Sequence, residues 1–589
     1  MTDLPPIAVI ADAHFHDTHS DYGCTCTTID GKQLTLRSWQ DTRKSSRVFN
    51  ESKDALITAL NDIQQRGVRH VVLLGDYTDD GQIESTKRIA NLLHHYRCDY
   101  DIAFYAIPGN HDFYGPAGKH QSTRFVSTAG STLVTSDPEV AVTEGETSVL
   151  TRNMYCEGSP AGLLPMADFG LFKRPEYHHW ETPFGTSDAA DLRMYDARSA
   201  DGSVKHSLMD ASYLVEPSDG IWLLMIDANV FEPRNGQSDP ARKKTFFDSS
   251  DAGWNAVLRV KPFLIDWIRD VCTRAKSSGK QLLAFSHYPT IDPIDQHTMS
   301  EARLFGNNLV VRRTPDVSVA NALIAAGLNL HFSGHMHVNN ATHHKNDGRT
   351  LSDIAVPSLV SFPACYKLIR STPSICEIDT IPIGAMPVDS TLINHYRAQS
   401  NPLSDEDETA LSATTYGEFL YRRIRTRVKY HYLLKEWPAD IACEIDNTTT
   451  ADLAYLLLAQ KNSPQTLKLK AMSDAITEKL ASDLYAAAAQ YELTRSDFDS
   501  CSMMTLIADW YCLRQAGPLA KAYISSKNLA LYTCLVESVD SSASGTSNTH
   551  AAFFKLLMGN LGRSIKSLGP IDKLTETNRT VTITQMLRY

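Results

Sequence analysis

The sequence predicts an α/β fold followed by a mainly α-helical module, and three observations support this. Apolar runs of strand length alternate with helical patterns over most of residues 1–385, as in a parallel sheet with crossover helices. After about residue 385 the strand-like runs stop, and apolar residues recur at helical spacing. The chain of 589 residues is also longer than one hydrophobic core usually serves. We therefore expect an α/β domain at 1–385 and a helical module at 386–589.

Polar residues follow each of the first predicted strands. Apolar runs of strand length occupy residues 7–11, 71–74 and 102–107. Helical stripes between them lie at residues 56–63 and 89–96. Asp12, Asp76 and Asn110 thus lie just beyond the carboxyl ends of strands. Open α/β sheets bind their ligands at that edge.

Residues 113–220 interrupt this alternation. They are rich in Gly, Pro, Ser, Thr and aromatic residues and have weak periodicity, which predicts a cap-like insertion over one edge of the sheet. The α/β pattern then resumes, with strands predicted at 221–227, 281–286, 328–332 and 352–356 and helices at 254–276 and 317–326.

The C-terminal module shows helical patterns instead of strand patterns. Its apolar residues recur at four-residue spacing, as at Met472, Ile476, Leu480 and Leu484. Residues 401–408 have the composition of a linker, and residues 541–549 that of a surface loop. If the protein is a homo-oligomer, we expect this module to form the contact between its copies.

Charge and composition exclude some classes of partner. The chain has 57 basic and 68 acidic residues, a formal net charge of -11, which discourages non-specific attraction to nucleic acid or to an anionic membrane. No run of eighteen apolar residues is present, and residues 1–10 lack the basic and long apolar regions of a signal peptide. The sequence thus predicts a soluble cytoplasmic protein that binds neither nucleic acid nor membrane.

The eleven cysteines predict no disulfide framework. Cys24 and Cys26 are close in the sequence, but their one-residue spacer does not fit the usual structural zinc pairs. We interpret this pair as inert and the chain as suited to a reducing compartment.

Short polar segments that follow strand patterns contain the residue types of a metal site. Each is weak alone, but together, and in this order, they predict one site at a single sheet edge. The candidate ligands are Asp12, His14, Asp76, Asn110, His287, His335 and His337. Two cations about 3.5–4 Å apart hold the attacking and leaving oxygens of a phosphoryl displacement when a carboxylate bridges them.

Asp76 is the candidate bridge between the two ions. The expected ligands are Asp12, His14 and His337 for one ion and Asn110, His287 and His335 for the other. In an extended segment the side chains of His335 and His337 point the same way. The two histidines therefore reach both ions only if the local turn splays them.

His111 is not needed as a ligand. We expect it near the substrate oxygens as leaving-group acid or charge stabiliser, with Asp79 fixing its orientation. Asp80 is expected to face solvent, although it could compete for pairing with His111. A hydroxide, formed because the cations lower the pKa of water, would attack phosphorus without a covalent intermediate. His178 and His179 are candidate substrate contacts, although a solvated loop is the simpler interpretation.

The chain resembles the calcineurin-like metallophosphoesterase superfamily in five motifs. These are Asp12-Ala-His14, Gly75-Asp76, Gly109-Asn110-His111-Asp112, Ser286-His287 and Gly334-His335-Met336-His337. The resemblance spans about residues 7–380. It implies a four-layer αββα sandwich with the capping insertion and helical module as additions, a dinuclear centre of iron, manganese or zinc, and hydrolysis of a small phosphomonoester or phosphodiester.

Two details point to a branch of this family. Gly-Asn-His-Asp followed by Gly-His-x-His is similar to the cyclic-nucleotide and glycerophosphodiester phosphodiesterases, which slightly favours a phosphodiester substrate over a monoester. Residues 223–229 and 358–366 also resemble large bacterial members of the family whose substrate is unassigned.

Other interpretations remain open. Asp12-Ala-His14-Phe-His16 also fits the Asp-x-His-x-His opening of amidohydrolases, which would make His14 and His16 ligands but leaves the later motifs unexplained. A non-catalytic metal-binding or interaction protein on the same fold would have the helical module as its working part. The basic run Arg422, Arg423, Arg425, Arg427 and Lys429 is interpreted as a solvated helix face or a subunit contact, because no base-stacking pattern accompanies it.

Overall fold

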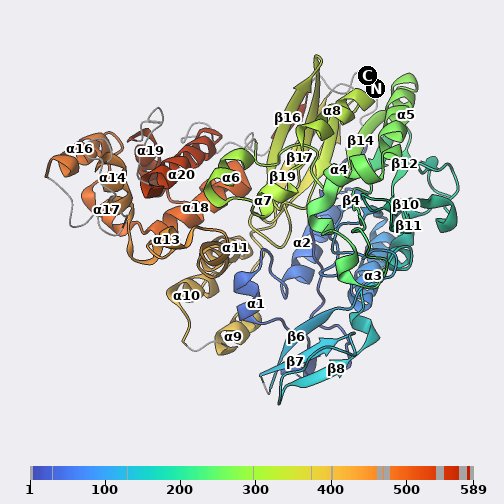
Figure 1. Ribbon diagram of the computed structural model, residues 1–589, viewed down its shortest axis with the longest axis horizontal. Helices are drawn as coiled ribbons and strands as arrows, with labels where there is room; N and C mark the ends of the chain where they lie inside the picture. The colour runs from blue at the N-terminus through green and yellow to red at the C-terminus, as the bar shows by residue number, and fades with distance from the viewer. Residues whose placement is uncertain are drawn as a thin grey trace.

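Two facing sheets, with helices on their outer sides, form one part of the molecule, and a helical part lies beside them (Figure 1). The computed structural model describes residues 4–24, 26–29, 31–128, 130–295, 297–372, 375–399, 402–459, 469, 478–538, 549–568 and 580–583. Met472 and Ile476 of the predicted helical stripe, and residues 541–548 of the predicted loop, lie outside the described residues.

The first sheet has the strand order β20-β19-β18-β1-β4-β5. Its parallel strands are β1 (Ile7–Ile10), β4 (His70–Leu74) and β5 (Ala103–Ile107). Its antiparallel strands are β18 (Cys365–Ser371), β19 (Cys376–Pro382) and β20 (Thr580–Ile583). All residues of β1 are buried, as expected of a strand covered on both faces.

The second sheet has the strand order β16-β17-β15-β14-β13-β12-β9. Its parallel strands are β13 (Ile221–Met225), β14 (Gln281–Phe285), β15 (Leu330–Ser333) and β17 (Arg349–Ala355). Antiparallel strands flank this centre: β16 (Asn340–Asn346) on one side, and β12 (Tyr213–Ser218) followed by β9 (His179–Glu181) on the other. The four strands predicted between residues 221 and 356 are confirmed here as the parallel centre of a sheet.

The side chains of β13 show how the layers are stacked. Leu223 and Met225 pack with residues of the first sheet, whereas Trp222 and Leu224 pack with the outer helices of the second sheet. Successive side chains of a strand point to opposite faces, so one apolar strand fills two layers of core.

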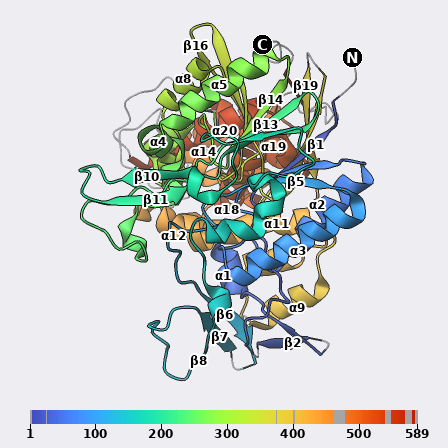
Figure 2. The ribbon, with the colours of Figure 1, turned by 90° about the vertical axis from the view of Figure 1, so that its right-hand side faces the viewer.

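Helices cover the outer face of each sheet. On the second sheet these are α4 (Ser249–Val260), α5 (Phe263–Ser277) and α8 (Val317–Ala326). The crossover helices of the first sheet are α2 (Ser52–Gln65) and α3 (Ile83–Tyr100), seen together in Figure 2. The described chain therefore has the four-layer αββα arrangement that the resemblance implies.

The sequence predicts that residues 113–220 form one cap-like insertion, but in the structure they do not. Part of them forms a small separate sheet, which projects from the lower end of the molecule in Figures 1 and 2; its strands are β6 (Ser122–Ser127), β7 (Gly130–Thr135) and β8 (Thr147–Leu150). Another part forms the hairpin of β10 (Met194–Arg198) and β11 (Lys205–Met209). β9 and β12 instead extend the second sheet. These strands are short, and their pairing partners are distant in sequence, so no local periodicity reveals them.

The chain after β19 is mainly helical in its described residues. Its longer helices are α9 (Ser390–Gln399), α11 (Tyr416–Arg427), α14 (Thr450–Ala459), α16 (Glu478–Ala489), α18 (Met503–Ala516), α19 (Ser526–Ser538) and α20 (Thr549–Lys566). β20 returns to the first sheet and pairs with β19, so the helical part is fastened to the sheet at both of its ends.

Two further features bear on the sequence predictions. Cys24 and Cys26 form a disulfide, so the interpretation of this pair as inert is wrong. The spacing of the two residues does not by itself determine the backbone turn that brings their sulfurs together. Among the described residues, no helix is both long and apolar enough to cross a membrane.

Candidate metal centre

The candidate ligands lie in loops that leave the carboxyl ends of strands from both sheets. Asp12 and His14 follow β1, Asp76 follows β4, and Asn110 follows β5 of the first sheet. His287 follows β14, and the His335/His337 pair follows β15 of the second sheet. The loops are tied together across the sheets, since the backbone N–H of His335 donates to Asp12 Oδ2 at 2.9 Å. The structure thus brings all seven predicted residues to one place.

Left-handed backbone conformations are concentrated at this site. The φ angles are 50° at Asp12, 40° at His14, 48° at Asp76, 66° at His335 and 54° at His337. Residues other than glycine rarely adopt positive φ, and such conformations are most often found at functional sites. At His335 and His337 they also replace the extended segment, so the two side chains diverge and reach different parts of the site.

Glycines leave room for the ligands. A Cβ atom added to Gly75 would lie 2.5 and 2.6 Å from two ring atoms of His287, and one added to Gly334 would lie 2.7 Å from Asp12 Oδ2. Because real Cβ contacts are not that short, any larger residue there would displace a candidate ligand. This explains why glycine precedes both Asp76 and His335.

One group of ligand atoms gathers around Asp12 and His14. His337 Nε2 lies 3.3 Å from Asp12 Oδ1 and 3.3 Å from His14 Nε2. His14 Nε2 lies 3.9 Å from Asp76 Oδ2. All of these side chains are buried or nearly so. The distances place an imidazole pair and a carboxylate around one point, with Asp76 beside it.

A second group gathers on the other side of Asp76. His287 Nε2 lies 3.3 Å from Asp76 Oδ2, and the ligand atoms of Asp76, His287 and His335 all lie within 4.8 Å of one another. The equivalent grouping on the first side is Asp12, His14 and His337. Asp76 therefore lies between two sets of donors.

Buried polar atoms without a hydrogen-bond partner indicate that the site is built for cations. Asn110 Oδ1 is buried and has no hydrogen-bond partner among the described residues, and His287 Nε2 has none besides its 3.3 Å contact with Asp76 Oδ2; such atoms are rare in folded proteins. Their other polar atoms are held in place: His287 Nδ1 donates to the carbonyl of Leu74 at 2.9 Å, and Asn110 Nδ2 donates to Ser250 Oγ at 3.1 Å. Such hydrogen bonds fix the tautomer and orientation of metal ligands.

The electrostatics of the site agree with this interpretation. Burial disfavours charge on both Asp76 and His287, but their mutual attraction outweighs it. The pKa of Asp76 is held well below its usual range by His287, His111 and His14, and the pKa of His287 is raised to about 9 by Asp76 and Asp12. Burial, together with the charges of Arg47 and other neighbours, lowers the pKa of His14. Carboxylates and imidazoles form a donor set that suits iron, manganese or zinc, and His287 would release its proton when a cation binds.

His111 lies at the edge of the ligand groups. Its backbone N–H donates to Asp76 Oδ1 at 2.7 Å, and its ring Nε2 lies 4.0 Å from Asp76 Oδ2. The prediction that Asp79 orients this ring is wrong. Asp80 Oδ1 lies 2.8 Å from His111 Nδ1, and Asp79 is instead paired with Arg47 at 2.8 Å. The adjacent side chains of Asp79 and Asp80 point in different directions. Which of them meets the His111 ring therefore depends on the tertiary structure and not on the local sequence.

Other predicted contacts lie away from the site. His179 is on β9, where its Nε2 pairs with Glu181 at 2.9 Å. Its partner in the ladder, Glu216 of β12, lies beside the amino end of β13, whereas the candidate ligands follow the carboxyl ends of strands. The backbone N–H of His178 donates to the carbonyl of Glu216. Neither histidine is placed to contact a substrate at the metal centre.

The amidohydrolase interpretation would require His16 as a ligand. Its Nε2 lies 2.8 Å from the carbonyl oxygen of Thr35, and its ring is stacked on Phe125 at 5.8 Å. His16 therefore faces away from the ligand groups.

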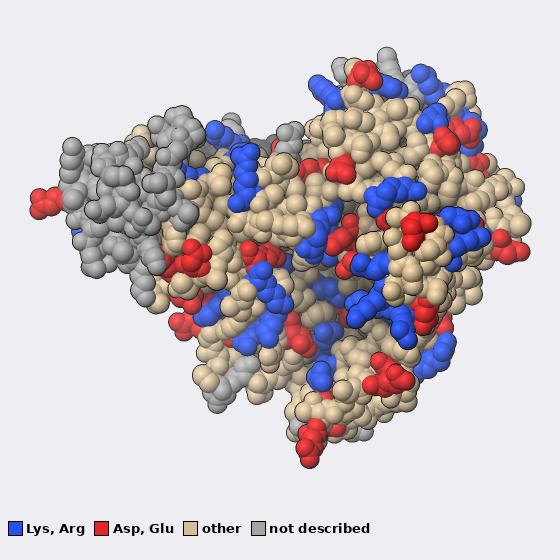
Figure 3. Space-filling view, viewed as in Figure 1, with Lys and Arg blue, Asp and Glu red and all other residues tan. Residues whose placement is uncertain are grey.

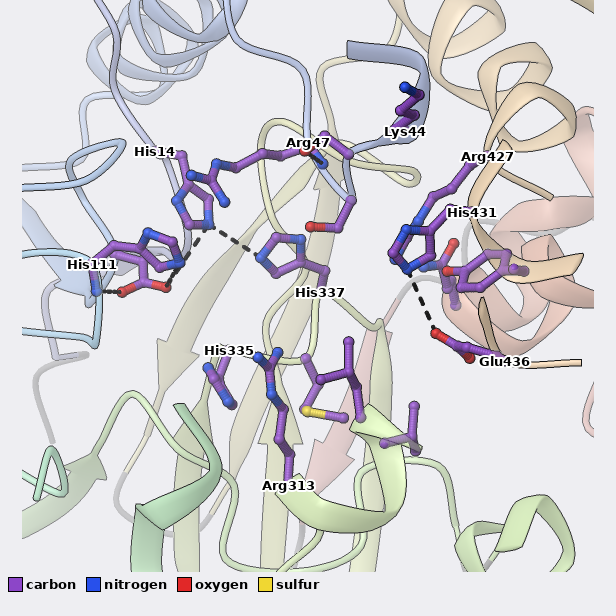
Figure 4. A pocket seen from close by; sticks show the side chains of 18 of the residues that line it. His14, Lys44, Arg47, His111, Arg313, His335, His337, Arg427, His431 and Glu436 are labelled. Atoms are coloured by element: carbon purple, nitrogen blue, oxygen red, sulfur yellow. Dashed lines mark hydrogen bonds and ion pairs between the residues drawn. The ribbon is translucent and has the colours of Figure 1, made fainter. Parts of the chain in front are cut away.

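A pocket opens over the metal centre and continues to the helical part. It has a volume of about 260 Å³ and is lined by His14, Asp76 and His337 on one side. Basic side chains form much of the remaining wall; they are Lys44, Arg47, Arg313, Arg427 and Arg514. Figure 4 shows Arg427 and His431 of the helical part opposite His337. The substrate-facing wall thus comes from the sheets and the helices together.

The basic residues of this wall were missed or misinterpreted from sequence. Arg427 belongs to the basic run that predicts a solvated face or subunit contact, but part of this run packs within the chain. Arg423 is buried and donates to the carbonyls of Thr42 and Ser45 at 2.8 and 2.9 Å. The sequence shows a helix with one basic and one apolar face. It does not show that the basic face packs on residues 42–45, which lie almost four hundred residues earlier in the chain.

Comparison with known proteins agrees with the motifs. Residues 5–151 match the family model of the calcineurin-like phosphoesterases. No curated protein matches the chain. Among solved structures, a dimetal phosphatase from Danio rerio is 12% identical with a TM-score of 0.35, covering 65% of this chain and 97% of that one. The phosphopantetheinyl hydrolase from Mycobacterium tuberculosis is 9% identical with a TM-score of 0.22, covering 60% of this chain and 90% of that one.

The assignment rests on the family match. The matched residues contain Asp12, His14, Asp76 and Asn110, together with His111. The resemblance expected from the motifs is confirmed by it: the chain contains the segment characteristic of a calcineurin-like phosphoesterase and is a metal-dependent phosphoester hydrolase.

Proposed function

We propose that this enzyme hydrolyses a small phosphodiester at a dinuclear metal centre bridged by Asp76. The observation that carries the proposal is the position of Asp76 between the Asp12, His14, His337 group and the His287, His335 group. The preference for a diester over a monoester rests on the combination of the Gly109–Asp112 and Gly334–His337 motifs, which resembles the phosphodiesterase branch of the family.

The protein's own residues have distinct tasks in this proposal. Bound cations would lower the pKa of water and neutralise charge on the phosphoryl oxygens. Asp76 holds the two ligand groups in one geometry, and the left-handed turns hold the histidines. His111, fixed by the Asp80 carboxylate at 2.8 Å, points its Nε2 toward the centre and donates a proton from this atom to the leaving oxygen.

A substrate panel tests the proposal. Metal-stripped protein is reconstituted with manganese, iron or zinc and assayed on phosphomonoesters, cyclic nucleotides, glycerophosphodiesters and nucleotide sugars. Asp76→Ala serves as the blank, and Asp266→Ala serves as the matched control because Asp266 is 78% exposed on α5. We expect hydrolysis only with metal, fastest on a diester class, in the wild type and the control. Monoesterase activity alone would contradict the diester preference, and activity that survives metal removal would contradict the mechanism.

A further inference from the structure

The wall of the pocket opposite the metal centre has a strong positive charge in an acidic protein. The chain has a formal net charge of -11, yet five Lys and Arg side chains line this pocket; these are Lys44, Arg47, Arg313, Arg427 and Arg514. Figure 3 shows a hollow at the centre of this face with Lys and Arg side chains gathered around it. Charge of one sign in a hollow concentrates the field and attracts ions of the opposite sign.

Three of these cations are already neutralised by carboxylates. Arg47 pairs with Asp79 at 2.8 Å. Arg313 pairs with Asp251 at 3.3 Å. Arg514 pairs with the buried Glu301 at 2.5 Å. The charges of these three side chains are therefore balanced within the protein itself.

Arg427 and Lys44 differ from the other three, because neither has a carboxylate at ion-pair distance among the described residues; the pocket residue Glu436 interacts with Arg427 only through longer-range charge. The guanidinium of Arg427 lies 4.5 Å from the ring centroid of Tyr432, and its Nε is buried without a hydrogen-bond partner in the described chain. Lys44 is exposed at the end of α1 (Trp39–Lys44). The neighbouring His431 has its own partner, Glu436, at 3.7 Å.

Arg427 is held in this position by its own helix. α11 is fixed against α1 through Arg423, and Arg427 follows one turn later at the end of α11. Figure 4 shows Arg427 and Lys44 on the side of the pocket that faces His337. A guanidinium held by stacking keeps its planar fork of N–H donors available to a phosphate or similar anion.

We propose that Arg427 and Lys44 form a second anion subsite, so that the substrate is a phosphoester carrying a further phosphate group. The phosphoester to be cleaved occupies the metal centre, and the second phosphate contacts Arg427 and Lys44 across the pocket. This proposal rests on the proposed function, because it takes the metal centre as the site of the first phosphate. The helical part then selects the substrate, whereas the sheets supply the chemistry.

Binding of α,ω-alkanediphosphonates tests the subsite with metal-loaded full-length protein. Each compound is compared by calorimetry with the alkylphosphonate of the same chain length, which can occupy the metal centre alone. Several spacer lengths are used, so that the span of the pocket is measured and metal chelation by the shortest compound is recognised. We expect one spacer length to bind at least roughly tenfold more tightly than its monophosphonate, as a charge-assisted contact would provide.

Variants assign this preference to particular residues. R427M and K44M should each reduce the preference severalfold, and R427K should restore part of it. Arg422→Met is the matched control: Arg422 is on the same helix, but bonds Ser412 Oγ at 3.1 Å outside the pocket. Lys44 is exposed, so K44M tests the subsite without disturbing the core. A preference absent from the wild type, or unchanged in both R427M and K44M, would overturn the proposal.

Hydrolysis assays separate the two proposals. Metal-loaded protein that hydrolyses phosphoesters but shows no preference for diphosphonates contradicts the subsite and leaves the proposed function standing. Protein that shows the preference but hydrolyses no phosphoester contradicts the proposed function and supports the subsite as an anion-binding site.

Discussion

At the scale of single residues, the ligand candidates hold conformations that their side chains do not favour. Asp12, His14, Asp76, His335 and His337 all have positive φ, at a cost of roughly 1–3 kcal/mol each. The surrounding contacts oppose this strain, as where Ser358 Oγ donates to the Asp12 carbonyl at 2.7 Å. We infer that the fold maintains the strained turns because they aim the ligands.

His111→Ala should retain the metals but lose turnover by roughly a hundredfold or more, because the leaving oxygen then lacks its proton donor. Kinetics on a phenyl ester and a p-nitrophenyl ester distinguish this role from a structural one. The loss should be greater for the phenyl ester, whose leaving group needs the proton more. An equal loss on both esters would remove His111 from the role of acid.

A site residue could be predicted from sequence when its position depends on the residues next to it in the chain. Asp12, Asp76 and Asn110 were found because each directly follows an apolar strand, and that relation survives folding. The sequence favours Asp79 over Asp80 without deciding between these adjacent residues, because only the turn determines which carboxylate meets His111. Arg427 was recognised as basic but not as part of a pocket, since its surroundings come from distant elements.

At the scale of elements, the strand-to-loop junctions determine the site. The parallel strands of a sheet end at one edge, and the loops that follow β1, β4, β5, β14 and β15 carry the candidate ligands. The long apolar strands and their helices were predictable from periodicity. β9 and β12 were not, since both are short and mixed in sequence and are defined by their pairing partners.

Gly75→Ala should lower both stability and metal content. The residue has a φ of 77°, and an added Cβ would meet the His287 side chain at 2.5–2.7 Å. Gly348→Ala is the control, since Gly348 has a φ of 74° and nothing within 4 Å of an added Cβ. We expect the control to lose about 1–2 kcal/mol in urea unfolding from the left-handed conformation alone, with full metal content. Equal behaviour of the two variants would mean that the close approach to His287 does not matter.

At the scale of the whole molecule, the helical part is joined to the α/β part over a broad buried surface. Hydrophobic residues of both parts belong to one continuous core cluster. β20 pairs with β19 of the first sheet. Arg423 of α11 donates hydrogen bonds to the carbonyls of Thr42, in the last turn of α1, and of Ser45, just after it. Sequence composition predicted a separate module because it shows the change from strands to helices, but it does not show which surfaces meet.

Arg423→Met should weaken this contact. Arg423 is buried and bonds the carbonyls of Thr42, Ser45 and Ser46, so its loss should cost about 1.5–3 kcal/mol in the free energy of unfolding. The segment that it holds leads into Arg47 of the pocket wall, so KM should rise as well. Arg422→Met, on the exposed side of α11, should change stability by less than about 0.5 kcal/mol. Equal unfolding midpoints for the two variants would contradict a coupling through Arg423.

The central claim is that Asp76 joins two metal ions in one centre. Metal analysis of protein reconstituted with manganese, combined with electron paramagnetic resonance, tests it most directly. The account predicts two ions per chain with a spin-coupled signal in the wild type and in Asp266→Ala, and loss of both the coupling and at least one ion in Asp76→Ala. Two ions with an unchanged coupled signal in Asp76→Ala would contradict it.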